Sequence, residues 1–192
     1  FPSGIAIAQN GNILIADNSN ERVQIFDANF NYIATLGTTL TQGNTNARFR
    51  RPADVYADDN GRIYVADTNN DRIQIFESDL THAGTIGTGN AGSANDALNN
   101  PIGVFLDGFG DIFIADLSNH RVQVFGNDLT YKTTLGTGNS GSGSNISKAA
   151  IISPQSGTTL TSTSVTFKWN SVAGAISYWL MIGDNTEEWN IY

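Results

Sequence analysis

Cysteine is absent from this sequence of 192 residues, and methionine occurs once, as Met181. The absence of cysteine excludes disulfide bridges, thiolate metal sites and cysteine nucleophiles within these residues. Lysine is scarce, with 3 residues against 22 asparagines and 20 glycines. No apolar run approaches the roughly 20 residues that a membrane-spanning helix needs, so we expect no membrane insertion.

Charged residues are also few, at 15% of the chain, and they leave a net charge of −8 and a pI of about 4.5. A surface of this sign repels phosphate groups, which argues against nucleic acid as a partner. Hydrophobic residues make up 40% of the chain, enough for a folded core. The sequence starts at Phe1 without a signal peptide, so we expect a processed chain or part of a longer one.

What the sequence does contain is a threefold internal repeat. Segments 13–26, 63–76 and 112–125 read ILIADNSNERVQIF, IYVADTNNDRIQIF and IFIADLSNHRVQVF, and they start 50 and then 49 residues apart. Flanking residues repeat as well, namely Pro2, Pro52 and Pro101, Gly11, Gly61 and Gly110, and Gly37, Gly87 and Gly136. The chain therefore repeats one structural unit three times.

Each unit holds four short runs rich in β-branched and aromatic residues. In the first unit these runs are 4–8, 12–16, 22–26 and 32–36, and Asn, Asp and Gly residues separate them. Short strands joined by tight turns predict an antiparallel meander. Such a sheet has two faces to bury, and a period of about 40–50 residues with four strands is typical of a propeller blade.

The pattern Pro-x-Gly, Gly-Asn-Ile and Ala-Asp-x-x-Asn-x-Arg-Val-Gln resembles the NHL repeat family of β-propellers. The resemblance covers residues 1–138 and implies an all-β fold with three blades, 1–40, 41–89 and 90–138. Because a propeller needs at least about four blades, we expect a partial ring that a longer chain or further copies complete. Members of the family include protein-binding scaffolds, RNA-binding proteins and enzymes, so the resemblance does not fix the function.

The remainder of the chain changes character. Residues 139–149 are rich in Gly and Ser and predict a flexible linker. Residues 150–192 resemble the opening strands of the Ig-like and fibronectin-III sandwiches of bacterial surface proteins, through an alternating Val165-x-Phe167-x-Trp169 strand. Such sandwiches need about 100 residues, so we expect only a partial Ig/fibronectin-III-like segment here.

One polar motif recurs in every unit, an Asp, an Asn three residues later and an Arg five residues later. We expect the Asp to cap the turn between two strands, the Asn to adopt a left-handed backbone and the Arg to brace the Asp. A ring of metal-binding carboxylates is the alternative. The nine residues are Asp17, Asn20, Arg22, Asp67, Asn70, Arg72, Asp116, Asn119 and Arg121.

Other motifs favour structural interpretations. Two Gly-x-Gly-x-x-Gly segments, 87–92 and 136–141, fall between repeats rather than before a helix, which dinucleotide binding would require. The acidic segment 58–61 lacks the ligand spacing of a calcium loop and coincides with a turn. His82 and His120 stand apart from other candidate ligands or bases. We therefore predict no catalytic residue, no cofactor and no metal site in the chain.

Two groups of residues are candidates for contact with a partner. The first is the one basic cluster, and the second consists of the three tryptophans, all of which lie in the C-terminal segment. They are Arg48, Phe49, Arg50 and Arg51, and Trp169, Trp179 and Trp189. We expect the partner to be a protein, either a copy of this chain or a surface protein, or a glycan.

These observations favour a non-catalytic interaction module or scaffold at the bacterial surface or outside the cell, one that assembles into oligomers or filaments. Two alternatives stay open. One is a metal-dependent lyase or lactonase-like propeller enzyme whose site lies in further blades. The other is an RNA-binding NHL domain, which the acidic composition disfavours.

Overall fold

The computed structural model of this chain describes residues 1–136, 151–153 and 168–169, and every structural statement below concerns these residues. The chain divides into two units, Phe1–Ser142 and Gly143–Tyr192. The regular structure of the first unit consists of strands and three 3-10 turns. None of the helical segments in the described ranges has the length or apolar character needed to cross a membrane.

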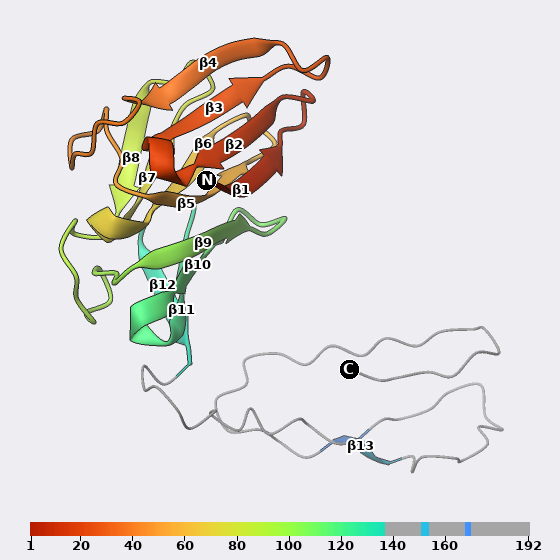
Figure 1. Cartoon of the computed structure of the whole chain (residues 1–192). Helices are drawn as coiled ribbons and strands as arrows, with labels where there is room; N and C mark the ends of the chain where they lie inside the picture. Colours follow the sequence, from red (N-terminus) through yellow and green to blue (C-terminus); the bar gives the residue numbers. More distant parts are fainter. Residues whose placement is uncertain (137–150, 154–167, 170–192) are drawn as a thin grey trace, which may run out of the picture. The chain divides into compact units, whose positions relative to one another are not determined.

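The first unit contains three antiparallel sheets of four strands, each with neighbouring strands in chain order (Figure 1). This arrangement confirms the prediction of three four-stranded propeller blades. Blade 1 comprises β1 (Pro2–Ile7), β2 (Ile13–Asp17), β3 (Arg22–Phe26) and β4 (Tyr32–Gly37). Blade 2 comprises β5 (Pro52–Ala57), β6 (Ile63–Asp67), β7 (Arg72–Phe76) and β8 (His82–Ile86). Blade 3 comprises β9 (Pro101–Leu106), β10 (Ile112–Asp116), β11 (Arg121–Phe125) and β12 (Tyr131–Leu135).

The same turn joins the second and third strands of each blade. A 3-10 turn follows the motif Asp, as η1 (Asn18–Asn20), η2 (Thr68–Asn70) and η3 (Leu117–Asn119). The next residue adopts a left-handed backbone, with φ of 59° at Glu21, 51° at Asp71 and 51° at His120. The expectation that the motif Asn adopts the left-handed backbone was wrong. The 3-10 turn extends through the Asn, and the residue after it takes that conformation.

Blade 2 packs between blades 1 and 3, and an apolar core fills each of the two interfaces. Strand alternation sends one set of side chains to each face, which is why the repeat carries apolar residues at both odd and even positions. The first core joins blades 1 and 2 through residues such as Leu14, Val23, Ile63 and Val65. The second core joins blades 2 and 3 through residues such as Tyr64, Ile73, Ile112 and Ile114.

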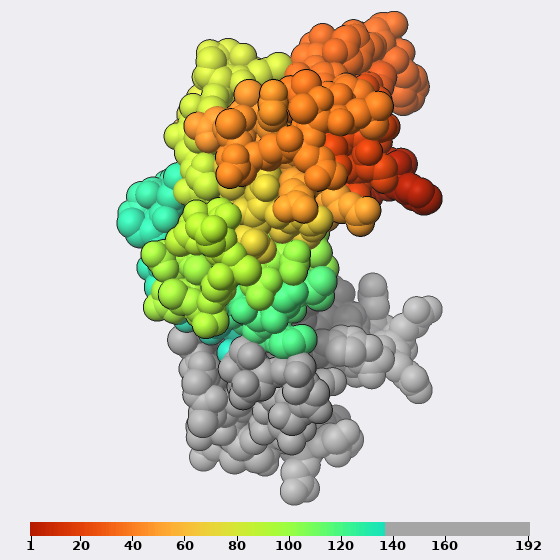
Figure 2. Space-filling view, turned by 60° about the vertical axis from the view of Figure 1, so that its left-hand side comes forward, coloured from red at the N-terminus to blue at the C-terminus, as the bar shows by residue number. Residues whose placement is uncertain are grey.

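The loops that connect the blades, residues 38–51 and 87–100, lie at the same end of the strands (left in Figure 1). In Figure 2 this side of the molecule comes forward, and the two loops follow one another across the surface. Each loop carries one fully buried apolar residue, Phe49 in the first and Leu98 in the second, both 0% exposed. The loops are therefore packed parts of the blade interfaces rather than simple connections.

In the second unit, β13 (Ile151–Ser153) pairs with β14 (Lys168–Trp169) in antiparallel fashion. The predicted Ig/fibronectin-III-like segment and the predicted linker fall mostly outside the described residues, so both stay predictions. The predicted blade boundaries at 40/41 and 89/90 stay predictions too, since they divide connecting loops that pack against the blades on both sides.

Candidate functional site

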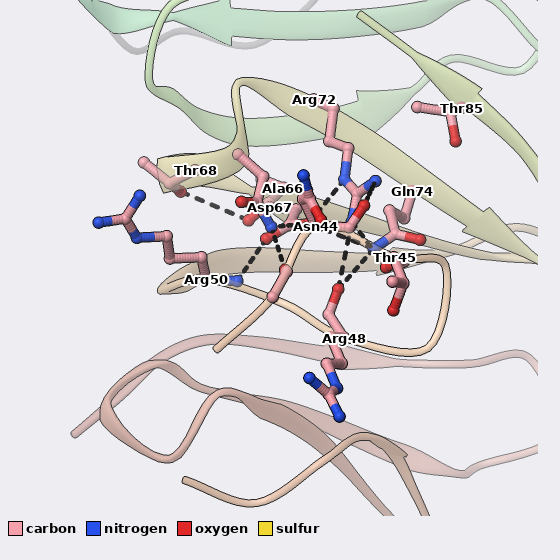
Figure 3. A network of polar contacts seen from close by, with 12 residues as sticks. Asn44, Thr45, Arg48, Arg50, Ala66, Asp67, Thr68, Arg72, Gln74 and Thr85 are labelled. Carbon is pink, nitrogen blue, oxygen red and sulfur yellow. Dashed lines mark hydrogen bonds and ion pairs between the residues drawn. The ribbon is translucent and has the colours of Figure 1, made fainter. Parts of the chain in front are cut away.

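The motif Asp of blade 2 lies at the centre of a polar network (Figure 3). One carboxylate oxygen of Asp67 accepts hydrogen bonds from Arg72 Nε at 2.8 Å, Asn70 Nδ2 at 2.9 Å and Gln74 Nε2 at 3.2 Å. The other oxygen accepts the backbone N–H of Arg50 at 2.7 Å. The Asp67 side chain is 0% exposed and that of Arg72 is 7% exposed, so this is a buried ion pair.

The rest of the Arg72 guanidinium binds the loop that connects blades 1 and 2. Its Nη1 donates to the carbonyl of Asn44 at 2.8 Å, and its Nη2 donates to the carbonyls of Thr45 and Arg48 at 2.9 and 3.2 Å. A rigid fork with five donors suits several backbone carbonyls at once, which a lysine could not serve. The motif thus fastens the connecting loop to the blade that follows it.

The same network recurs in blade 3, with the loop that connects blades 2 and 3. Asp116 accepts hydrogen bonds from Arg121 Nε at 2.7 Å and from the backbone N–H of Asn99 at 2.7 Å. Arg121 donates to the carbonyls of Ser93, Ala94 and Ala97 at 2.7 to 2.9 Å. The Asp therefore caps a loop from the preceding blade interface rather than its own turn, which corrects the expectation from sequence. The motif Asp makes no side-chain cap of the 3-10 turn, whose closing hydrogen bond runs from the backbone N–H of the residue after the turn to the carbonyl of its first residue.

In blade 1 the motif side chains adopt the same internal geometry without a loop bound to them. Asp17 accepts from Arg22 Nε at 2.9 Å and from Asn20 Nδ2 at 2.8 Å. Its second oxygen lies 3.7 Å from the amino group of Phe1. Arg22 Nη1 contacts Thr39 Oγ1 at 3.3 Å. Among the described residues, no backbone carbonyl is bound to the guanidinium of Arg22.

Burial and hydrogen bonding shift the pKa values of the motif carboxyl groups in opposite directions. Burial alone would raise the pKa of Asp17, but hydrogen bonds from Asn20 and Arg22, together with the charge of Arg22, lower the pKa below its ordinary value. At the fully buried Asp67, loss of hydration dominates and raises the pKa, against the hydrogen bonds from Arg50, Asn70 and Arg72. The difference reflects how much more deeply the loop buries the blade 2 carboxylate.

A second polar feature lies at the opposite end of the strands, between the first turns of blades 2 and 3. We call it the blade 2–3 cleft, a cavity of about 610 Å³ whose walls include Tyr56, Asp58, Arg62, Tyr64, Glu77 and Asp107. Tyr64 donates through its hydroxyl to Asp58 Oδ2 at 3.3 Å, and Arg62 Nη2 pairs with Glu77 Oε1 at 2.8 Å. Burial and the neighbouring acidic residues raise the pKa values of both Tyr56 and Tyr64.

The blade 2–3 cleft departs from the repeat. At the positions of Tyr56, Asp58, Arg62 and Tyr64 in blade 2, blade 1 carries Ala6, Ala8, Asn12 and Leu14. The equivalent space between blades 1 and 2 is a smaller cavity of about 120 Å³, lined mainly by apolar residues. Sequence analysis missed this site, although the alignment of the repeats contains its signal, polar residues in blade 2 where blade 1 carries mainly apolar ones, with Asp107 of blade 3 at the position of Asp58.

The structure places the predicted partner-contact residues in different environments. Phe49 is fully buried against Phe76, with ring centroids 5.9 Å apart, so it is not available to a partner. This corrects the expectation for Phe49: apolar burial between blades outweighs surface contact. Arg48, Arg50 and Arg51 are exposed. Trp179 and Trp189 lie outside the described residues, as does the side chain of Trp169.

No set of three or more His, Cys, Asp or Glu side chains within the described ranges is placed to hold a metal ion. The three motif carboxylates each bind an Arg of their own blade, at 2.7 to 2.9 Å. Their acceptor oxygens are therefore directed to protein donors, and the arrangement offers hydrogen bonding and ion pairing as its chemistry.

Comparison with known proteins identifies the repeat. A family model described as NHL repeat matches residues 1–26, 49–76 and 98–125. The matched segments cover the first three strands of each blade, so an NHL repeat is detected in each of the three blades. No curated protein matches the chain.

Solved structures of the same fold include enzymes. A streptogramin B lyase structure shares 13% identity and a TM-score of 0.51, covering 72% of this chain and 41% of that one. A catalytically inactive virginiamycin B lyase from Staphylococcus aureus with quinupristin shares 13% identity and a TM-score of 0.55, covering 73% of this chain and 43% of that one. A protein of unknown function from Bacteroides caccae shares 13% identity and a TM-score of 0.51, covering 69% and 48%.

These comparisons overturn one prediction. The expectation that this chain is not an enzyme was wrong to exclude catalysis, because lyases are among the proteins that share its propeller fold. Likeness at 13% identity shows the fold alone. The chain spans about two fifths of the length of these lyase structures.

Proposed function

We propose that this chain is an interaction module that joins further NHL blades, supplied in the simplest case by a second copy of itself, into a larger propeller. The observation that carries the proposal is the outer face of blade 1. Ile5 and Ile7 on β1 are 67% and 72% exposed, and Phe30 in the turn after β3 is 77% exposed. Apolar side chains exposed together on one sheet face mark an interaction surface.

The repeat shows what covers such a face. The equivalents of Ile5 and Ile7 in blade 2 are Val55, which is buried in the core against blade 1, and Ala57, which packs against that core. The equivalent of Phe30 is Leu80, which packs against the same core. The outer face of blade 1 is therefore the face that another blade covers wherever a preceding blade is present.

Blade 3 offers the complementary face at the other end. Phe105 and Leu135 are 57% and 47% exposed. Their blade 2 equivalents, Tyr56 and Ile86, contribute to the core against blade 3. The two outer faces thus correspond to the two halves of an interface that the chain already forms twice, which supports pairing between copies.

The solution mass of the purified chain tests this proposal. Two copies with three blades each would give six blades, and light scattering should report about twice the chain mass of 20.5 kDa. Larger species would indicate the open, filament-forming mode of association. A monomer at every concentration would overturn the proposal. A bacterial surface or extracellular location stays part of the proposal, and antibody labelling of intact cells would test it.

A second candidate is a propeller enzyme that acts on a small molecule in the blade 2–3 cleft. Two observations favour it: the polar departure from the repeat at this cleft, and the lyases among structures of the same fold. A cavity of about 610 Å³ is within the usual range for small-molecule sites. The sequence suggested a different form of this candidate, a metal-dependent lyase or lactonase-like enzyme whose site lies in further blades.

Quinupristin is a reasonable first probe for this candidate, since one of the similar lyase structures contains it. Calorimetric titration of the chain should show saturable binding that Asp58→Asn weakens, because the carboxylate orients the Tyr64 hydroxyl in the cleft. Ile33→Lys, away from the cleft, is the matched control. Absence of both binding and chemical conversion would argue against this substrate class.

A further inference from the structure

We propose that the motif side chains of blade 1, Asp17, Asn20 and Arg22, form a binding site for the connecting loop of another NHL blade. We call this set the blade 1 latch. The occupant is a peptide segment of the kind that leads into the first strand of a blade. It presents one backbone N–H and at least four carbonyl oxygens. The inference deepens the proposed function and rests on it, because it names which segment of a joining blade is recognised.

The ligand is known from the chain itself, because the equivalent side chains of blades 2 and 3 each hold such a loop. In blade 2 the loop donates one N–H to Asp67 at 2.7 Å. It accepts hydrogen bonds through the carbonyls of Gly43, Asn44, Thr45 and Arg48, at 2.7 to 3.2 Å. Blade 3 repeats this pattern with the carbonyls of Gly92, Ser93, Ala94 and Ala97.

The blade 1 latch is already arranged for the same ligand. Asp17 and Arg22 face one another across β2 and β3 as register partners, like Asp67 and Arg72. The internal hydrogen bonds of the motif, Asn20 to Asp17 and Arg22 to Asp17, are formed at 2.8 and 2.9 Å. A site whose side chains are held in place before binding loses little conformational entropy when the ligand arrives.

Exposure distinguishes the blade 1 latch from its two occupied counterparts. The Arg22 side chain is 23% exposed, against 7% for both Arg72 and Arg121. The Asp17 side chain is 10% exposed, against 0% for Asp67 and Asp116. The difference corresponds to the surface that a bound loop covers in blades 2 and 3.

An apolar contact accompanies the polar one. In the loop before blade 2, Phe49 packs edge-on against Phe76, with ring centroids 5.9 Å apart. The equivalent of Phe76 in blade 1 is Phe26, which is only half-buried. A bound loop would thus place its apolar residue against Phe26 while its carbonyls reach Arg22.

The chemistry of the blade 1 latch favours a peptide backbone over an anion. Arg22 alone would attract a carboxylate or phosphate, but the Asp17 carboxylate lies 2.9 Å from its Nε and would repel either. A backbone segment supplies a donor for Asp17 and acceptors for Arg22 and Asn20 together. One peptide segment therefore forms hydrogen bonds with both the negatively charged Asp17 and the positively charged Arg22.

The test uses synthetic peptides and the 192-residue chain. A peptide of residues 91–100, AGSANDALNN, contains the loop that blade 3 binds and carries no excess positive charge that an acidic protein would attract nonspecifically. We expect saturable binding of one peptide per chain, monitored by fluorescence polarisation or NMR shifts. Arg22→Ala should weaken binding by at least about tenfold, since charge-assisted hydrogen bonds are lost. Arg62→Ala, at the opposite end of the strands, should leave binding unchanged.

A second peptide keeps the test decisive if Arg22→Ala lowers the stability of blade 1. Replacing Leu98 by Asp within the peptide should abolish binding to the unaltered chain. If the chain is dimeric at every concentration, added peptide should instead compete and lower the mass. A monomeric chain that binds the peptide supports the latch while refuting self-assembly. The inference would be overturned if the peptide neither bound the chain nor changed its mass. It would also be overturned if Arg22→Ala bound the peptide as well as the unaltered chain does.

Discussion

The carboxylate of Asp67 accepts the backbone N–H of Arg50 at 2.7 Å, so a side chain at the end of β6 fixes the chain two residues before β5. Asp116 makes the same contact with Asn99, also at 2.7 Å. The repeated motif thus binds each connecting loop to the blade that follows it.

Loss of the buried arginine should cost far more in blade 2 than in blade 1. Arg72→Met would leave the fully buried Asp67 unpaired and release three loop carbonyls, lowering the free energy of unfolding by about 3–5 kcal/mol. Arg22→Met removes a partly exposed pair with no loop bound and should cost no more than about 1 kcal/mol. Urea unfolding of the two variants makes the comparison. Equal losses would show that the loop contacts do not stabilise the blade.

Gly87 should resist substitution by alanine. It has a φ of +98°, and an added Cβ would lie 2.6 Å from the Asp71 carbonyl oxygen. Backbone strain and this clash together should lower stability by about 2 kcal/mol or more. Gly108→Ala is the matched control, since a Cβ there meets no atom within 4 Å. Thermal unfolding of both variants would refute the argument if Gly87→Ala were as stable as Gly108→Ala.

Acid should weaken blade 1 through Asp17. Its pKa is lower in the folded chain than in the unfolded chain, so its contribution is present above the ordinary carboxyl pKa of about 4 and is lost as pH falls through the lowered value. The free energy of unfolding should therefore decline less steeply below about pH 4 in Arg22→Met than in the unaltered chain. Parallel declines in denaturant titrations at several pH values would contradict this role of Arg22.

Association between copies should depend little on salt. The outer face of blade 1 is apolar, with Ile5, Ile7 and Phe30 exposed, and hydrophobic burial is not screened by ions. A tenfold increase in NaCl should change the dimer dissociation constant by less than about threefold. Sedimentation equilibrium at two salt concentrations measures this. Dissociation of the dimer at high salt would point to the exposed arginines, Arg48, Arg50 and Arg51, as the contact instead.

The repeat made the blades predictable because each strand and turn occurs three times, so a strand over 4–8 could be identified from its match to 54–58 and 103–107, and the structure places β1 at Pro2–Ile7. The role of Arg72 was not predictable in full. Its partners are backbone carbonyls of Asn44, Thr45 and Arg48, and a carbonyl carries no sequence signal. The same limit explains the assignment of Phe49 to the surface: its burial depends on how the loop folds over the blade interface.

The blade 2–3 cleft illustrates a different limit. Its polar residues were visible as departures from the repeat, Tyr64 against Leu14 for example. What the sequence did not indicate was that Tyr64, Asp58 and Asp107 face one cavity, because they belong to turns of two blades that only the packing of blade 2 on blade 3 brings together.

Light scattering of two matched variants would show whether another blade covers the outer face of blade 1. Ile7→Asp places a charge on the outer face, whereas Ile33→Lys removes an exposed apolar side chain from another surface and introduces the residue type found at the equivalent Lys132. We expect Ile7→Asp to have the mass of one chain, 20.5 kDa, and Ile33→Lys and the unaltered chain to have about twice that mass. Identical masses for all three proteins would contradict this expectation.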